Sequence, residues 1–132
     1  MEGMFMLRCD NCDTILSKRH QKVFCSNSCQ QDKQYKLYIE RWQNGFEKGH
    51  IGKTIQLSGH VRRWLHENRG TACEVCGWDI KHPVDGRTLT EIDHTDGDAT
   101  NCTPENLKVL CPNHHAMSPF HRNRNKNSKR QR

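Results

Sequence analysis

Apolar residues recur at helical spacing in the second quarter of the chain. Tyr35, Ile39, Trp42 and Phe46 are separated by four, three and four residues, which is the repeat of one face of a helix. The pattern predicts a helix over residues 28–45, with a glycine as a suitable stop at its end. Such an aromatic stripe packs in a core or stacks on nucleic-acid bases, and we favour the core.

A second amphipathic helix is predicted between Ser58, a good N-cap residue, and Gly70. Val61, Trp64 and Leu65 form its apolar face. Its opposite face is basic and carries Arg62, Arg63, His66 and Arg69. A charged face is usually only solvated, so simple solvation and contact with phosphates both stay open.

The segment before this helix, residues 45–57, contains three glycines and is predicted to be a linker. Further along, residues 88–94 (TLTEIDH) alternate apolar and polar positions as a strand does, and residues 107–111 (LKVLC) predict a second strand. Residues 95–98 (TDGD) are typical of a turn, and Pro112 suits the first turn of a helix. In this strand–loop–strand–helix unit, His94 lies at the end of the first strand, Asn106 precedes the second strand, and His115 lies on the helix.

The composition indicates that burial of apolar side chains alone does not hold the chain together. Only 33% of the 132 residues are hydrophobic, and the mean hydropathy is -1.00. Small domains with so little apolar material usually add disulfides or metal ions, and the chain has eight cysteines and nine histidines. Its start has no long apolar run, which predicts a cytoplasmic protein without a membrane span. Reduced thiols then favour zinc over the alternative, a disulfide-rich secreted module.

The formal net charge of +6 is unevenly distributed. Residues 17–66 have ten Lys or Arg against three acids, residues 71–117 have three against eight, and the residues from Ser118 onward have six and no acid. An acidic, cation-attracting segment therefore lies between basic segments suited to a polyanion.

The first four cysteines have the spacing of a zinc site. Cys9 and Cys12 are separated by two residues, and Cys25 and Cys29 by three. Four thiolates in two such pairs predict one tetrahedral structural Zn²⁺.

A second set of ligands comprises Cys73, Cys76, Cys111 and His114. Three thiolates and an imidazole form a standard structural zinc site, and 34 residues lie between the two pairs. That gap is too long for a simple finger loop. Cys102 is left over, and we expect a free thiol there, although it could compete with His114 as the fourth ligand.

The residues Asp93-His94, Asn106 and His115, set between the two zinc-ligand pairs, resemble the motif of the HNH endonucleases. The resemblance covers residues 71–120 and implies a small α+β, zinc-stapled fold of the ββα-metal, treble-clef-like type. The FCSNSC and WQNG segments of the first half also resemble small phage or prophage HNH proteins.

The resemblance implies a nuclease that hydrolyses phosphodiester bonds. His94 would be the base that activates water, and Asn106 would hold the loop and orient that imidazole. Asp93 and His115 would hold one catalytic divalent ion, Mg²⁺ or Mn²⁺. Taken singly, Asp93-His94 could be turn chemistry and Asn106 a cap. Two nearby acids, Asp96 and Asp98, are interpreted as turn residues before metal ligands.

The adjacent histidines His114 and His115 are expected to face different ions. Successive helical residues point about 100° apart. His114 can therefore face the structural zinc with Cys111, while His115 faces the cleft with Asp93.

Three segments are predicted: a zinc module with helix and linker (1–57), a basic helix with the HNH domain (58–120), and a flexible basic tail (121–132). The expected partner is double-stranded DNA, in a bacterial or phage-infected cell. A single HNH site cuts one strand per event, so double-strand cleavage would need a homodimer, a second binding event or a partner enzyme such as a phage protein. The rival hypothesis is a non-catalytic zinc-finger protein that binds DNA or RNA. The residues expected to contact nucleic acid are Arg62, Arg63, Arg69, Arg122, Arg124 and Lys126.

Overall fold

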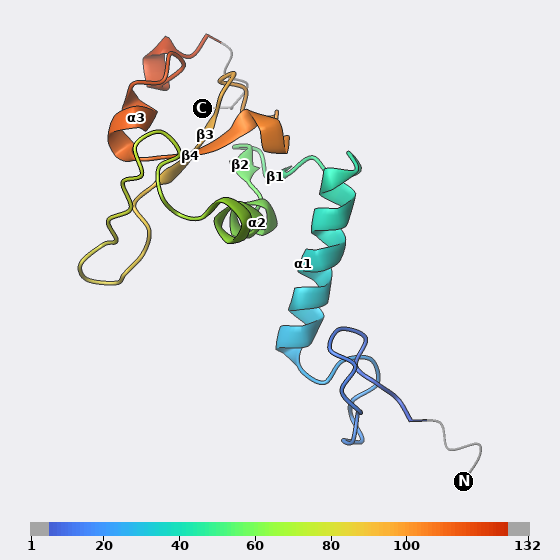
Figure 1. Cartoon of the computed structure of the whole chain (residues 1–132). Coiled ribbons are helices and arrows are strands. Elements are labelled where there is room, and N and C mark those ends of the chain that lie inside the picture. Colours follow the sequence, from blue (N-terminus) through green and yellow to red (C-terminus); the bar gives the residue numbers. More distant parts are fainter. Residues whose placement is uncertain (1–5, 127–132) are drawn as a thin grey trace. The chain divides into compact units, whose positions relative to one another are not determined.

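The structure is a computed structural model that describes residues 6–126 (Figure 1). The chain divides into two compact units, residues 1–41 and residues 42–132. This division lies within the first helix, whereas the sequence placed its first boundary at residue 57. The predicted limits at 57 and 120 stay predictions, and each unit is described by itself.

The first unit consists of a looped segment and most of helix α1 (Asn27–Gln43). A bridge between Arg8 and Ile15 closes the first loop. Two contacts then attach this loop to the helix: Asn11 Nδ2 donates to Asp32 Oδ2 at 2.9 Å, and Lys33 Nζ donates to the carbonyl of Asp10 at 3.3 Å. The cysteine-bearing loop and the start of α1 are therefore held together by side chains as well as by the chain itself.

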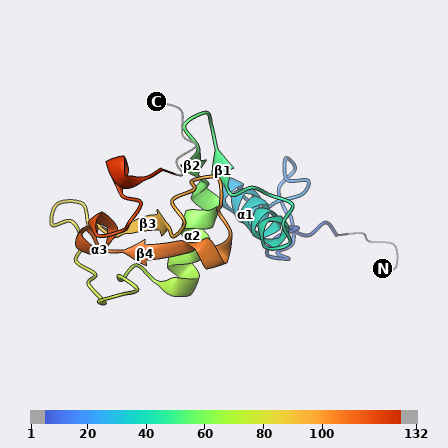
Figure 2. The same cartoon turned by 90° about the horizontal axis from the view of Figure 1, so that it is seen from above.

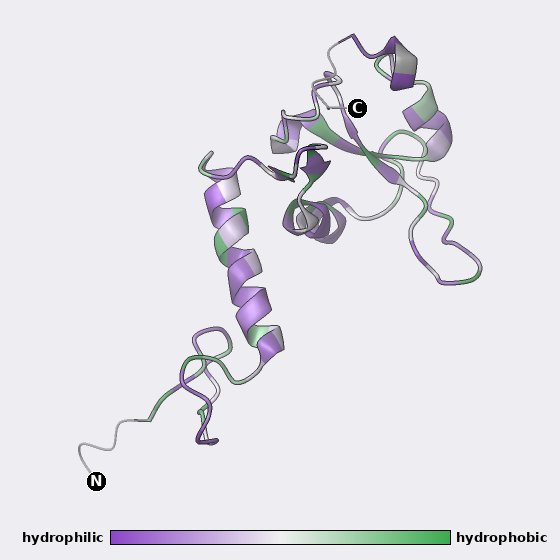
Figure 3. Cartoon of the chain, turned by 180° about the vertical axis from the view of Figure 1, so that it is seen from behind, coloured by the Kyte–Doolittle hydropathy of each residue, from purple (hydrophilic) through white to green (hydrophobic). Residues whose placement is uncertain are grey.

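Helix α1 has the predicted position, but its apolar stripe is one residue shorter than expected. Tyr35, Ile39 and Trp42 are at most 8% exposed, whereas Phe46 is 79% exposed. The helix ends at Gln43 and Gly45 has a φ of 83°, so Phe46 lies beyond the helix and off its buried face. Figure 3 shows that hydrophilic residues dominate the rest of α1.

The second unit begins with a short hairpin where a linker was predicted. Strand β1 (His50–Ile51) pairs antiparallel with β2 (Gln56–Leu57). Gly49 precedes the hairpin with a φ of 83°, and a Cβ placed there would lie 2.8 Å from Cys102 Cβ. Only glycine fits such a close approach. Strands of two residues leave no periodic pattern, so the sequence did not reveal this hairpin.

Helix α2 (Gly59–Arg69) has the predicted bounds and caps. The hydroxyl of Ser58 accepts a hydrogen bond from the backbone N–H of His60, and the N–H of Gly70 donates to the carbonyl of His66. Its buried face includes Val61 and Leu65, which are fully buried.

Strand β3 (Glu91–His94) and strand β4 (Leu107–Leu110) form an antiparallel pair in which Glu91 lies opposite Leu110 and His94 opposite Leu107 (Figure 2). Helix α3 (Pro112–Ala116) begins at the predicted proline and packs on both strands. The expected strand–loop–strand–helix order is confirmed. Two 3₁₀ turns complete the unit, η1 (Pro104–Asn106) and η2 (Arg122–Arg124).

The buried interior of this unit is small. Leu107 and Val109 of β4 are fully buried, and Leu110 packs with two zinc-ligand candidates, Cys73 and Cys111. Within residues 6–126, no helix is long and apolar enough to cross a membrane. With so few apolar side chains, cross-links between distant segments are expected to matter for stability.

Candidate active site and metal centres

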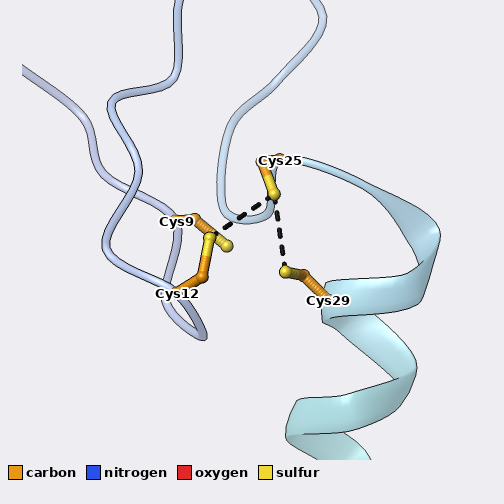
Figure 4. Close-up of side chains that lie close together, drawn as sticks. All are labelled: Cys9, Cys12, Cys25 and Cys29. Carbon is orange, nitrogen blue, oxygen red and sulfur yellow. Dashed lines mark hydrogen bonds between the residues drawn. The ribbon is translucent and has the colours of Figure 1, made fainter.

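The first four cysteines converge at the start of α1, where Cys9, Cys12 and Cys25 come from the preceding loops and Cys29 from the helix itself (Figure 4). Their sulfurs all lie within 4.8 Å of one another, with Cys12 and Cys25 3.6 Å apart and Cys25 and Cys29 3.4 Å apart. Thiolates at 2.3 Å around a tetrahedral zinc are separated by about 3.8 Å, and a disulfide by about 2.05 Å. The spacing of these four cysteines therefore fits a zinc ion.

The second group joins two segments that are far apart in the sequence. Nδ1 of His114 lies 3.7 Å from the sulfur of Cys73 and 3.2 Å from that of Cys111, while Cys76 and Cys111 are 3.9 Å apart. A tetrahedral zinc with mixed sulfur and nitrogen ligands has separations of about 3.5–3.8 Å. The structure thus brings His114, and not Cys102, to this group.

In both groups, the neighbouring thiols and backbone N–H groups shift the pKa values of individual cysteines. Burial opposes ionisation of Cys9 and Cys73, but hydrogen bonds from neighbouring backbone N–H groups outweigh it and lower the pKa of each to about 6. The hydrogen bond between Cys25 and Cys29 helps to raise the pKa of Cys25 to about 12. One thiolate forms readily in such a cluster, and further thiolates require a cation beside it, as a zinc site supplies.

Asp93 and His115 face each other across the contact between β3 and α3. Oδ1 of Asp93 lies 3.2 Å from Nδ1 of His115, and the two side chains are 14% and 26% exposed. Despite that distance, Nδ1 of His115 is inaccessible and has no hydrogen-bond partner among the described residues. Adjacent ligands of an octahedral ion at 2.0–2.1 Å are about 3 Å apart. A carboxylate oxygen and an unpartnered ring nitrogen at this separation fit two ligands of one ion.

Burial raises the pKa of the Asp93 carboxyl above its usual range, and the neighbouring His115 only partly offsets that effect. A carboxylate in such a position is stabilised by a nearby cation. The raised pKa of Asp93 and its distance from His115 therefore both fit a cation bound between these two side chains.

A cavity of about 740 Å³ opens over this pair. It is lined by three of the four residues of the predicted HNH set, Asp93, His94 and His115. Arg62 of α2 and Arg122 of η2 also line this cavity, so cationic side chains reach the same cavity as the carboxylates.

Three further features of the cavity were missed by the sequence analysis. Glu91 Oε2 lies 3.4 Å from Nε2 of His115, and the ring of His121 packs edge-on against that of His115 at 4.9 Å. Thr54 and Gln56 of the hairpin also line the cavity. The period of two in a strand places Glu91 on the face of Asp93, so the sequence could have indicated Glu91. It held no signal for the other residues.

Asn106 fastens the loop between β3 and β4. Its amide nitrogen donates to Asp96 Oδ1 at 3.0 Å and to the carbonyl of Asn101 at 2.7 Å, and its amide oxygen accepts from the N–H of Asp96 at 3.1 Å. These bonds agree with the loop-holding part of its predicted role.

The two acids of this loop are engaged within it. Burial acts to raise the pKa of Asp96, but hydrogen bonds from Asn101, Asp98 and Asn106 outweigh it and lower the pKa. Asp98 Oδ1 accepts from the N–H and hydroxyl of Thr100. Both acids act as turn residues here, as the sequence analysis favoured.

The basic residues expected to bind nucleic acid lie in different settings. Arg63 pairs with Glu67 at 3.2 Å on the surface of α2. Arg69 instead donates to the backbone carbonyls of Pro104 and Leu107, so its guanidinium holds α2 against the η1–β4 segment. Arg124 and Lys126 are exposed.

The segment predicted as a flexible tail starts with structure. Within residues 121–126, η2 forms, and Asn125 Nδ2 donates to the carbonyl of Gly97 at 2.7 Å. This contact joins the tail to the loop after β3. Residues 127–132 of the predicted tail lie outside the described residues.

The chain is 40% identical over 89 residues to the H-N-H endonuclease F-TflIV of Escherichia phage T5. The match covers 67% of this chain and 38% of the phage protein, so the chain spans well under half the length of this relative. The match confirms the predicted resemblance to the HNH endonuclease family. No protein-family profile matches the chain, and no solved structure matches it.

Proposed function

We propose that this protein is a metal-dependent HNH endonuclease that hydrolyses DNA phosphodiester bonds, with a zinc-stapled ββα-metal module over residues 71–120. The observation that carries the proposal is one cavity lined by Asp93, His94 and His115, in which the partly buried carboxylate of Asp93 lies 3.2 Å from a ring nitrogen of His115 that has no hydrogen-bond partner among the described residues. The likeness to a phage HNH endonuclease supports it.

Asp93 and His115 would hold a divalent ion, for which Mg²⁺ and Mn²⁺ are the candidates. Such an ion supplies positive charge to the scissile phosphate and to the oxygen that leaves. His94 accepts the proton of the attacking water, since an imidazole titrates near neutral pH. Asn106 contributes indirectly, because it fixes the loop that follows His94.

The charge distribution supports a polyanionic substrate. Glu91, Asp93 and their neighbours alone would repel a phosphate backbone, whereas Arg62 and Arg122 add cations to the lining of the same cavity. We propose that these arginines, with exposed Arg124 and Lys126, provide much of the affinity for double-stranded DNA. The two cysteine-rich groups would each hold a structural zinc ion.

The proposed function also implies a cellular location and a requirement for cutting both strands. An enzyme of this kind would act in the bacterial cytoplasm, where bacterial and phage DNA are found. One cavity would cut one strand in each event, so cutting both strands would take a homodimer, a phage partner protein or a second binding event.

The test is cleavage of supercoiled plasmid with Mg²⁺ or Mn²⁺, comparing wild type with His94→Ala. We expect His94→Ala to lower the rate by about 10²-fold or more, the usual contribution of a general base, and to leave DNA binding unchanged. His82→Ala is the matched control, because it removes a surface imidazole that is outside the cavity.

Equal rates for wild type and His94→Ala would refute the nuclease proposal. DNA or RNA binding without any cleavage by wild type would instead support the rival hypothesis of a non-catalytic zinc-finger protein.

A further inference from the structure

The eighth cysteine, Cys102, belongs to neither zinc group, and it lies against the imidazole that we propose as the general base. Its side chain is buried, with 2% of the residue exposed. Its sulfur lies 3.5 Å from Nε2 of His94. Resting on the proposed function, we propose that Cys102 is a positioning residue: its sulfur accepts a hydrogen bond from Nε2–H of His94 and leaves Nδ1 as the basic nitrogen.

The direction of this hydrogen bond follows from counting protons. A thiol has one proton to donate, and the thiol of Cys102 donates to the carbonyl of Ala99 at 3.2 Å. The sulfur is then an acceptor toward His94. A neutral imidazole carries its proton on the nitrogen whose hydrogen bond requires it, so that proton lies on Nε2.

The backbone around Cys102 is fixed by contacts from the segment that precedes α2. Trp42 Nε1 donates to the carbonyl of Cys102 at 2.8 Å, and Trp42 is only 4% exposed. Gly49 approaches so closely that a Cβ there would lie 2.8 Å from Cys102 Cβ. Little room is left for the thiol to move away from the imidazole. Although Cys102 lies 60 residues after Trp42 in the sequence, this contact gives its backbone a defined orientation in the loop.

A thiol in this place could also serve only as packing, and two substitutions separate the roles. Cys102→Ala removes the acceptor, whereas Cys102→Ser keeps a smaller one. A buried hydroxyl costs more than a methyl group unless it is hydrogen-bonded, so a packing role predicts that Ala is tolerated at least as well as Ser. A positioning role predicts the opposite order of cleavage rates.

The first measurement is single-turnover cleavage of a DNA duplex with saturating Mn²⁺. We expect Cys102→Ala to lower the rate by about tenfold or more, part of the contribution of a general base, and Cys102→Ser to retain more activity than Cys102→Ala. DNA affinity should stay within about twofold in both variants. An Ala rate equal to that of wild type, or an Ala rate above the Ser rate, would overturn the proposal.

The second measurement does not depend on activity. In protein labelled with ¹⁵N-histidine, at a pH where His94 is neutral, we expect a single Nε2–H tautomer in wild type and a mixture of tautomers in Cys102→Ala. Val109→Ala is the control, since it removes fully buried apolar volume from β4 and should keep the wild-type tautomer. An Nδ1–H tautomer in wild type, or no change in Cys102→Ala, would overturn the proposal.

The two measurements also separate this proposal from the proposed function. If wild type failed to cleave DNA with any divalent ion, the nuclease proposal would fall, and the tautomer of His94 would still decide the placement of Cys102. If wild type cleaved DNA and both Cys102 variants behaved as wild type in both measurements, the positioning role would be refuted and the proposed function would stand.

Discussion

The two adjacent histidines provide the sharpest test of how this small domain is built. His114 lies with three cysteines, and His115 lies with Asp93 in the cavity. We therefore expect His114→Ala to lose the second zinc ion and much of the stability of the domain. In contrast, His115→Ala should keep both zinc ions and the fold but lose cleavage.

The expected loss of stability in His114→Ala can be estimated from the length of the loop that the zinc ion closes. Its ligand pairs tie residue 73 to residue 111. By the relation used for covalent cross-links, closing such a loop is worth about 4 kcal/mol. A small domain has a free energy of unfolding of about 5–15 kcal/mol. Loss of this clamp should thus lower the Tm by on the order of 15 °C or more.

The assay combines zinc content with thermal unfolding for each variant. His114→Cys is the matched control, because it keeps four ligands and should bind zinc and unfold as wild type does. An unchanged zinc content and Tm in His114→Ala would show that the zinc clamp is not where we place it. Loss of zinc in His115→Ala would show that the two ions are assigned the wrong way round.

Three other variants test the site and its supports. Burial raises the folded-state pKa of Asp93, so the ionised carboxylate destabilises the fold when no Mg²⁺ or Mn²⁺ is bound beside it. With the structural zinc ions retained and no Mg²⁺ or Mn²⁺ added, Asp93→Asn should therefore raise the Tm at pH 7, with the gain disappearing as the pH falls through that pKa, and Mn²⁺ should stabilise only wild type. Asn106→Ala removes three hydrogen bonds and should cost about 3 kcal/mol in urea unfolding, whereas Asn113→Ala, on the exposed side of α3, should cost little. Arg69→Ala removes two bonds to backbone carbonyls and should also cost about 3 kcal/mol, whereas Arg63→Ala should change stability by less than about 1 kcal/mol.

Each expectation has a result that contradicts it. A lower Tm for Asp93→Asn at pH 7, measured with zinc retained and no Mg²⁺ or Mn²⁺ added, would mean that the fold stabilises the ionised carboxylate rather than destabilising it by burial. Equal stability of Asn106→Ala and Asn113→Ala would mean that the loop does not depend on the Asn106 amide. A loss of DNA affinity without loss of stability in Arg69→Ala would favour the predicted phosphate contact over the structural one.

Much of the local structure could be read from short stretches of sequence. Ser58 and Gly70 predicted the ends of α2, and Pro112 predicted the start of α3. The cysteine pairs predicted which thiols would meet. Each of these features depends on residues within a turn or two of one another, or on a ligand spacing that chemistry restricts strongly.

Phe46 and Arg69 show where local pattern was not enough. Phe46 continued an apolar stripe, but the helix ended before it and left the side chain exposed. Arg69 belonged to a basic face, but its guanidinium found two backbone carbonyls more than 30 residues away. A helical pattern predicts the face on which a residue lies, but it does not predict which distant segment packs against that face.

The sequence by itself predicted the two cysteine-rich groups that could hold metal ions, the order of β3, β4 and α3, and the candidate residues of the HNH motif. Only the tertiary structure placed the 50–57 hairpin on the wall of the cavity and Cys102 beside His94. The physical reason is that these contacts depend on close approach of distant segments, as at Gly49 and Trp42, where steric fit and single hydrogen bonds decide the geometry. Such contacts leave no periodic trace along the chain.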